Sequence, residues 1–331
     1  MSEKKDIFLE VKDLQIQYTS AGEVIQAVNG VSFSLERGKT LALVGETGAG
    51  KTTVCKSILR ILPDRSAKVM GGDVILDGEE LLQLPEAEMR KIRGRKIAMV
   101  FQDPMTALNP VMRVGDQIAE VFKIHQSLSK SEAAKRAVDM LKMVGIAPER
   151  FIEYPHQFSG GMKQRVIIAM ALACTPELLL ADEPTTALDV TIQAQILEMI
   201  ADLRKKYDTS MILVTHDLGI VASNADYVAI IYAGEIVEYG DKMSVFKKPS
   251  HPYTVGLFGA IPNLEVDTRR LANIEGMPPD PTNLPAGCSF SPRCPYAAEE
   301  CTAHHPELKE LEPGHSCRCV KTAAVLEGKN G

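Results

Sequence analysis

Short, unbroken apolar runs recur along the chain and end at polar or glycine-containing turns. They lie at residues 41–44, 97–101, 178–181 and 211–214. Runs of four or five apolar residues without polar alternation are typical of strands in a parallel sheet that is covered on both faces. The pattern therefore predicts an α/β fold whose core is a parallel sheet.

The segments between these runs have other periodicities. Strand-like stretches lie at residues 8–11, 24–28, 31–35 and 74–76. Helical periodicity extends over residues 114–144, with a break at 126–129, and again over residues 190–206. From residue 249 to 313 prolines are frequent and the periodicity fades, which indicates a small appended region.

The composition excludes some classes of function. The formal net charge of −6 gives no support to a nucleic-acid-binding role. The charged N-terminus is not a signal peptide, and the longest strongly apolar stretch, residues 166–174, is too short to cross a bilayer. We therefore expect a cytosolic chain, unless it docks on a membrane-embedded partner.

A glycine-rich turn between a predicted strand and a predicted helix carries the first chemical signal. Residues 45–52, GETGAGKT, fit the pattern G-x-x-x-x-G-K-S/T of phosphate-binding loops. Glycines let backbone N–H groups surround a phosphate, Lys51 brings a positive charge to the β- and γ-phosphates, and the Thr52 hydroxyl is a hard ligand for Mg²⁺. We expect the following helix over residues 51–62. The predicted ATP contacts of this loop are Gly45, Glu46, Thr47, Gly48, Ala49, Gly50, Lys51, Thr52 and Thr53.

Two further stretches have the composition of nucleotide-handling segments. The apolar run at 178–181 ends in Asp182 and Glu183, which would reach Mg²⁺ and the attacking water, although a solvated strand end looks the same. Ser159 and two glycines precede a helix and form a second phosphate-binding helix N-terminus. One site does not need two such loops, so Ser159 is expected to face nucleotide held by another subunit. A turn capped by Ser159 is the alternative.

In their order, the phosphate loop, the acidic strand end and the Ser-Gly-Gly turn resemble the ATP-binding-cassette (ABC) ATPases over residues 7–250. The resemblance implies three catalytic residues: Glu183 positions or deprotonates water, His216 contacts the γ-phosphate, and Gln102 senses Mg²⁺. It also implies Mg²⁺ ligands, which are Thr52, Gln102 and Asp182. The further ATP contacts that it implies are Tyr18, which stacks on adenine, Gln102, Ser159, Gly160, Gly161, Met162, Gln164 and Asp189.

The same resemblance implies a domain organisation. We expect an ABC cassette over residues 1–250, with a parallel-sheet core, an antiparallel β subdomain and a helical subdomain at about 105–165. A small Cys-rich extension would follow over residues 251–331. The loop Ala187-Leu188-Asp189 matches the family's loop that crosses the dimer interface. Phe158 and Met162 stand where Leu and Gln are usual, but neither position contacts phosphate through its side chain.

Longer strings at residues 101–110, 154–162 and 251–254 are similar to the ATPases of the oligopeptide, dipeptide and nickel importers. This resemblance implies a subunit that hydrolyses ATP to power peptide uptake through two transmembrane permease subunits, with an external solute-binding protein acting indirectly. Such subunits lie peripherally on the cytoplasmic face of the cell membrane. They usually pair with a second, related ATPase, so a heterodimer is favoured over pairing with itself.

Residues 104–110 match the segment that couples the ATPase to a permease, and charges at Met105 or Leu108 are expected to uncouple the two. The solute stays open between dipeptide, longer peptide, nickel complex and oligosaccharide. One rival function is a soluble ABC ATPase that acts on ribosomes or DNA, against which the single cassette and the coupling segment argue. The other is a regulatory subunit that binds ATP without hydrolysing it, against which Glu183 and His216 argue.

Five of the seven cysteines fall in the last fifth of the chain: Cys288, Cys294, Cys301, Cys317 and Cys319. In a cytosolic protein such clustering favours a metal over disulfides. An iron–sulfur cluster, zinc and free thiols are the alternatives, and the first three cysteines lack the tight pairs usual for zinc. His304, His305 and His315 could ligate zinc or could simply lie at the surface.

The resemblance includes an extension in which four cysteines hold a 4Fe–4S cluster in some members. The related extensions place a histidine four residues before their final cysteine, and His315 stands four residues before Cys319. The predicted ligands are therefore Cys288, Cys294, Cys301 and Cys319, with Cys317 as the alternative fourth ligand.

Overall fold

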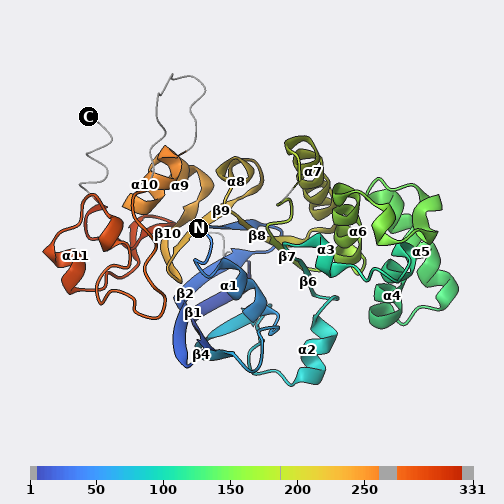
Figure 1. The fold of residues 1–331 in the computed structure, drawn as a ribbon, viewed down its shortest axis with the longest axis horizontal. Coiled ribbons are helices and arrows are strands. Elements are labelled where there is room, and N and C mark those ends of the chain that lie inside the picture. Colours follow the sequence, from blue (N-terminus) through green and yellow to red (C-terminus); the bar gives the residue numbers. More distant parts are fainter. Residues whose placement is uncertain (1–5, 187, 261–273, 323–331) are drawn as a thin grey trace. The chain divides into compact units, whose positions relative to one another are not determined.

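The computed structural model describes residues 6–186, 188–260 and 274–322 (Figure 1). The chain divides into two compact units. The first unit consists mainly of Glu36–Thr40 and Gln83–Val214, and the second of Ile7–Leu35, Leu41–Leu82 and the chain from Thr215 onward. The described residues after 250 therefore belong to the same unit as the phosphate loop.

The N-terminal strands of the second unit form a four-stranded sheet (Figure 1). These strands are β1 (Ile7–Ser20), β2 (Glu23–Glu36), β4 (Ala67–Leu76) and β5 (Glu79–Glu80), in the order β2-β1-β4-β5. β4 is antiparallel to both of its neighbours, which confirms the predicted antiparallel portion. The stretches predicted at 24–28 and 31–35 are one strand. The Asn29 N–H donates to the Gly234 carbonyl and its side-chain amide to the Ala233 carbonyl, so this polar position is held in the strand rather than in a turn.

A second group of strands in this unit leads into the phosphate loop. β3 (Thr40–Val44) pairs in parallel with β9 (Tyr227–Tyr232), and β9 pairs antiparallel with β10 (Glu235–Asp241). Beyond β10 the order continues with β12 (His315–Cys317) and β11 (Lys309–Glu312). The C-terminal region is thus built onto the edge of this sheet. Periodicity could not predict these two strands, because β12 has three residues and every residue of β11 is exposed.

The helices of the second unit are short. They are α1 (Lys51–Ile58), α8 (Leu218–Asn224), α9 (Lys242–Lys247), α10 (Pro252–Gly259) and α11 (Glu299–Ala303), with a 3₁₀ turn, η3 (Ser291–Arg293). The prediction that the first helix reaches residue 62 is wrong. Arg60 adopts a left-handed φ of 50°, and the Ile61 N–H turns back to the Lys56 carbonyl.

An aromatic core joins the C-terminal region to the rest of the second unit. The ring centroid of Tyr232 in β9 lies 4.6 Å from that of Tyr253 in α10 and 5.2 Å from that of Phe290. Tyr253 and Phe290 are 5.5 Å apart, and all three side chains are buried. Burial of each such ring contributes roughly 1.5–3 kcal/mol.

The first unit contains three parallel strands, β8 (Ser210–Thr215), β7 (Leu178–Asp182) and β6 (Ile97–Val100), in that order. Every residue in them is buried, which confirms the parallel sheet predicted from the apolar runs. The helices of this unit are α2 (Glu86–Ile92), α3 (Pro104–Ala107), α4 (Val114–Gln126), α5 (Lys130–Met143), α6 (Gly160–Leu172) and α7 (Val190–Tyr207), with 3₁₀ turns η1 (Pro148–Ile152) and η2 (Pro155–Gln157).

The predicted break between the two long helices of this unit is confirmed. Ser127 ends α4 with a left-handed φ of 53°, and Ser129 starts α5 with a capping box to Glu132. α4 and α5 pack against each other, and both contact α6 (Figure 1). This helical group thus packs against α6, the helix that Ser159 precedes.

Candidate nucleotide and cysteine sites

The phosphate loop connects β3 to α1 in the second unit. Gly50 has a left-handed φ of 98°, and a Cβ built there would lie 2.4 Å from the Ala27 carbonyl oxygen, so only glycine fits. The buried Lys51 donates from Nζ to the carbonyl oxygens of Gly45 and Glu46, over 2.7 and 2.8 Å. The loop thus wraps its own lysine at the start of a helix, where backbone N–H groups favour an anion.

Tyr18, predicted to stack on adenine, lies near the end of β1. Its hydroxyl is 3.4 Å from the Thr53 hydroxyl in the first turn of α1. The tyrosine is half-buried. Two residues far apart in the sequence and predicted separately as nucleotide contacts therefore lie side by side in the second unit.

The acidic pair lies at the end of β7 in the first unit. Asp182 is 2% exposed, and Glu183 follows it with a left-handed φ of 45°, an uncommon backbone conformation for a non-glycine residue. Gln102 Nε2 donates to Glu183 Oε2 over 2.8 Å, and the Thr186 hydroxyl donates to the same oxygen over 2.8 Å. A carboxylate held in this way can accept a proton from, or orient, an attacking water.

The Ser-Gly-Gly turn is a helix start with an exposed serine. Ser159 caps α6, and its hydroxyl accepts from the Met162 N–H over 3.4 Å. A Cβ on Gly161 would lie 2.6 Å from Cγ2 of Ile192 in α7. Asp189 caps α7 by accepting from the Ile192 N–H, and its side chain is exposed. The two predicted dimer-interface elements thus lie together on the first unit, while Ala187 of the same loop lies outside the described residues.

Two other predicted residues have different surroundings. Gln164 is 2% exposed, and its Nε2 donates to the Pro184 carbonyl over 2.5 Å. It therefore braces the segment after Glu183, and the predicted contact of Gln164 with nucleotide stays a prediction. His216 follows β8 and is exposed at the surface of the second unit. Asp217, beside it, caps α8.

One residue in the predicted coupling segment also differs from expectation. Leu108 is 4% exposed, so it is a core residue rather than a contact for a permease. The side chain of Met105 is outside the part of the chain that the structure describes. Exposed apolar side chains of the same unit include Phe101, Val111 and Ile152, at 39%, 80% and 61% exposure. Apolar content alone could not distinguish these positions from Leu108.

Sequence reasoning missed two residues that hold the phosphate loop. The Arg293 guanidinium makes a two-pronged ion pair with the Glu46 carboxylate, at 2.9 and 3.0 Å. The Tyr253 hydroxyl accepts from the Glu46 N–H over 2.9 Å. Tyr253 stands in the string at 251–254 and Arg293 directly before Cys294, so both had a signal nearby, but neither motif implied a contact with the loop.

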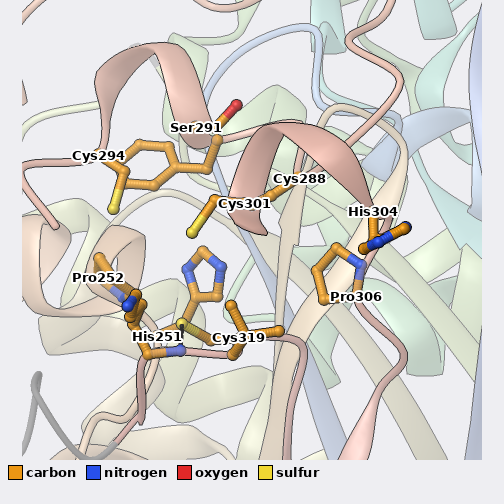
Figure 2. A pocket seen from close by; sticks show the side chains of 12 residues that line it. His251, Pro252, Cys288, Ser291, Cys294, Cys301, His304, Pro306 and Cys319 are labelled. Atoms are coloured by element: carbon orange, nitrogen blue, oxygen red, sulfur yellow. Dashed lines mark hydrogen bonds between the residues drawn. The ribbon is translucent and has the colours of Figure 1, made fainter. Parts of the chain in front are cut away.

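The predicted cysteine ligands line one cavity in the C-terminal region (Figure 2). Cys288, Cys294, Cys301 and Cys319 surround a volume of about 20 Å³, with His251 and His304 in the wall. Burial raises the pKa of the Cys288 and Cys294 thiols, and it raises that of Cys319 to about 11. In the absence of a metal these thiols therefore hold their protons at neutral pH.

The remaining cysteine and histidines of this region have other environments. Cys317, in β12, is 1% exposed and is not among the residues that line the cavity. His305 Nε2 lies 2.7 Å from Glu235 Oε1, and His315 Nε2 lies 2.8 Å from Glu238 Oε1. The predicted metal centre is not confirmed, because no three His, Cys, Asp or Glu side chains within the described ranges are grouped so as to hold a metal ion.

The fold, the phosphate loop, the acidic strand end and the Ser-Gly-Gly turn define a cassette-type ATPase, and comparisons with known proteins agree. Residues 28–186 match the family model described as "ABC transporter", and residues 237–301 match "Oligopeptide/dipeptide transporter, C-terminal region". A solved ATP-binding cassette, described as dimeric in a post-hydrolysis state with ADP and Pi, superposes with a TM-score of 0.63 and 29% identity. It covers 70% of this chain, and the match spans 98% of that chain.

Curated relatives match over nearly the whole length. The chain is 49% identical to the dipeptide transport ATP-binding protein DppD of Bacillus subtilis, over 94% of this chain and 93% of that protein. It is 51% identical to the oligopeptide transport ATP-binding protein OppD of the same organism, over 93% and 87% of the two chains. This chain belongs to the ABC ATPases of the oligopeptide and dipeptide transporter family. The resemblance to this family is confirmed. Within the described part of the chain, no helix is both long and apolar enough to span a membrane.

Proposed function

We propose that this chain is the subunit that binds and hydrolyses ATP to drive import of dipeptides or oligopeptides through two membrane permease subunits. The observation that carries the proposal is the oriented Glu183 carboxylate, which Gln102 and Thr186 hold on one oxygen. An inactive ATP-binding subunit would have no need for a carboxylate aligned by two donors. The names of the relatives, dipeptide and oligopeptide transport ATP-binding proteins, supply the substrate class.

Each nucleotide-handling segment has a role in this proposal. The loop from Gly45 to Thr53 cradles the phosphates around Lys51, and Tyr18 stacks on the adenine ring. Thr52, Gln102 and Asp182 are the Mg²⁺ ligands. Glu183 positions or deprotonates water, and His216 contacts the γ-phosphate. The half-buried Tyr18 beside Thr53 supports the adenine assignment, because it brings an aromatic ring close to the start of α1.

A dimer completes each site in this proposal. The signature residues Ser159, Gly160, Gly161 and Met162 bind nucleotide held by the loop of a second cassette, and Asp189 lies in the interface. Support comes from the exposure of Ser159 and Asp189, and from Val190, which is 83% exposed although it is apolar. The solved cassette that this chain resembles is described as dimeric. A second, related ATPase is the favoured partner, and a copy of this chain is the alternative.

The permease contact is assigned to two exposed apolar residues of the first unit, Val111 and Ile152. Val111 and Ile152 flank the hydrogen bond from the Val114 N–H to the Glu153 carbonyl, which ties their two segments together. Exposed apolar side chains grouped on adjoining segments are a common mark of a protein contact. Docking there would hold the chain peripherally on the cytoplasmic face of the membrane.

We also propose that the chain consists of a cassette over residues 1–250 and an extension over residues 251–331.

We also propose that Cys288, Cys294, Cys301 and Cys319 bind a metal centre, with a 4Fe–4S cluster favoured over zinc. Four thiols around one cavity are a chemically suitable donor set for either. The cavity volume of about 20 Å³ is roughly that of a single water molecule. Binding of a cluster would therefore have to move the four side chains apart, whereas one zinc ion would need less movement.

Reconstituted transport tests the function as a whole. The chain would be placed with its permeases, its ATPase partner and a solute-binding protein in lipid vesicles, and uptake of labelled dipeptides and longer peptides would be followed. We expect uptake that depends on ATP and is lost with Glu183→Gln. ATP-dependent uptake of a nickel complex or an oligosaccharide, with none of peptides, would refute the substrate class but keep the ATPase. ATPase activity that requires ribosomes or DNA would refute the transport role.

A further inference from the structure

Glu46, the second residue of the phosphate loop, is held on both its side chain and its backbone by the C-terminal region. Arg293 pairs with its carboxylate through both terminal nitrogens, at 2.9 and 3.0 Å. Tyr253 accepts a hydrogen bond from its N–H over 2.9 Å. The three residues lie in the same compact unit. This arrangement joins residues 247 positions apart in the sequence, which is why no local motif predicts it.

The arginine is itself firmly positioned. Its side chain is 6% exposed, and its guanidinium also donates to the Glu275 carbonyl over 3.1 Å and to the Tyr232 hydroxyl over 3.3 Å. The guanidinium carbon lies 5.7 Å from the centroid of the Tyr232 ring. Tyr232 belongs to the aromatic core described above, so the arginine is anchored on a rigid element. A two-pronged pair with a fixed arginine imposes a direction on the carboxylate as well as a charge.

Glu46 touches the group that is proposed to bind phosphate. The Glu46 carbonyl accepts a hydrogen bond from Lys51 Nζ over 2.8 Å. The Glu46 N–H donates to the Tyr253 hydroxyl. Both the N–H and the carbonyl of Glu46 are therefore held by hydrogen bonds. A shift of Glu46 would move the lysine and the following N–H groups of Thr47 and Gly48 together.

Arg293 also neutralises the negative charge of Glu46. The pattern G-x-x-x-x-G-K-S/T does not require an acid at this position. A carboxylate beside a loop that must hold a polyphosphate repels it, by an amount that grows where water is excluded. Pairing with Arg293 cancels that charge and keeps the carboxylate turned toward the guanidinium.

We propose that Arg293 is a positioning residue of the phosphate loop, which acts through Glu46 to set the affinity for ATP. The C-terminal region is then part of the nucleotide site rather than only an appendage. This inference rests on the proposed binding of ATP to the loop. No sequence motif assigns a role to Arg293.

The test is a set of full-length variants in which ATP affinity, thermal stability and steady-state kinetics are measured together. Arg293→Met leaves Glu46 unpaired, and we expect the Kd for ATP to rise about tenfold. Arg293→Lys keeps the charge but not the two-pronged geometry, so an intermediate value is expected. In the double variant Arg293→Met with Glu46→Gln, the unpaired charge is gone, and much of the affinity should return. KM should change more than kcat throughout.

Arg318→Met is the matched control. Arg318 lies in the same region and its guanidinium donates to the Ile236 and Pro306 carbonyls, not to the phosphate loop. It should lose stability but keep the wild-type Kd. An unchanged Kd in Arg293→Met and Arg293→Lys would overturn the proposal. So would an equal loss of affinity in Arg318→Met at the same melting temperature, because the effect would then be general loosening.

These outcomes separate the inference from the function on which it rests. If the wild-type chain fails to bind ATP, the proposed function is wrong. If the wild type binds ATP and the Arg293 variants bind it equally well, only the positioning role is wrong. Should Arg293→Met not fold, Arg293→Lys still decides the question, because it keeps a positive charge that can donate a hydrogen bond to Glu46.

Discussion

The side-chain amide of Gln102 donates to Glu183 Oε2 over 2.8 Å, although 81 positions separate the two residues in the sequence. The Thr186 hydroxyl donates to the same oxygen. Two donors on one oxygen restrict the rotation of the carboxylate, and the left-handed backbone of Glu183 fixes where the side chain starts. Gln102, which is proposed to sense Mg²⁺, is therefore hydrogen-bonded to Glu183, the proposed base. A movement of Gln102 would thus shift the Glu183 carboxylate.

Glu183→Gln should keep ATP binding and lose most hydrolysis. The amide preserves the shape and can still accept from Gln102, but it cannot accept a proton from water, and loss of a general base typically lowers the rate about 10²–10⁴-fold. Phosphate release and equilibrium binding of a fluorescent ATP analogue would be measured on the same preparation. With ATP the variant should accumulate as a closed dimer with its partner. Turnover near that of the wild type would remove Glu183 from the mechanism.

Lys51→Ala should act at an earlier step, on nucleotide affinity itself. The substitution removes the positive charge that the proposal places at the β- and γ-phosphates, and a lost charged hydrogen bond raises the Kd by at least about tenfold. Lys56→Ala is the control, because Lys56 lies in the last turn of the same helix. Equal Kd values for the two variants would contradict the assignment of Lys51.

The local motifs were predictable because their chemistry is written in neighbouring residues. The loop at 45–52 and the buried strands each depend on a few consecutive positions. Long-range partners were not predictable in this way: nothing near Arg293 or Tyr253 points to Glu46. Burial was the other gap. Leu108 and Gln164 sit inside motifs that also contain exposed or partly exposed residues, and only packing shows that both face the interior.

Ser159→Arg should leave ATP binding by this chain unchanged and impair hydrolysis at the site whose phosphate loop belongs to the partner. Ser159 also caps α6, and loss of a cap lowers the free energy of unfolding by about 0.5–2 kcal/mol. Ser129→Arg is a matched control, because Ser129 caps α5 in the same unit without belonging to the signature. It should lose similar stability and keep hydrolysis. If the Ser159 variant loses ATP binding as an isolated monomer, the assignment of Ser159 to the partner's site is wrong.

Val111→Glu and Leu108→Glu should separate coupling from folding. Val111 is 80% exposed, so a charge there should change the free energy of unfolding by less than about 0.5 kcal/mol. It should leave ATPase activity in place while uptake falls in vesicles. Leu108 is 4% exposed, and a carboxylate there should lower the free energy of unfolding by about 3 kcal/mol or more. Normal uptake by the Val111 variant, with no cross-link to a permease from this position, would rule out the proposed docking surface.

The last prediction concerns the fourth cysteine ligand. Cys319 lines the cavity with Cys288, Cys294 and Cys301, while Cys317 is buried in β12 outside the lining. Chain purified without oxygen should be brown and contain about four irons per chain if the cluster forms. Cys319→Ala should remove most of the iron, and Cys317→Ala should keep it.

Alanine is used because a serine hydroxyl buried at position 317 would add a destabilising effect of its own. Cys174→Ala, in the other unit, controls for loss of a buried thiol. Stoichiometric zinc without iron or acid-labile sulfide would refute the cluster, and loss of iron in the Cys317 variant alone would refute only the ligand choice.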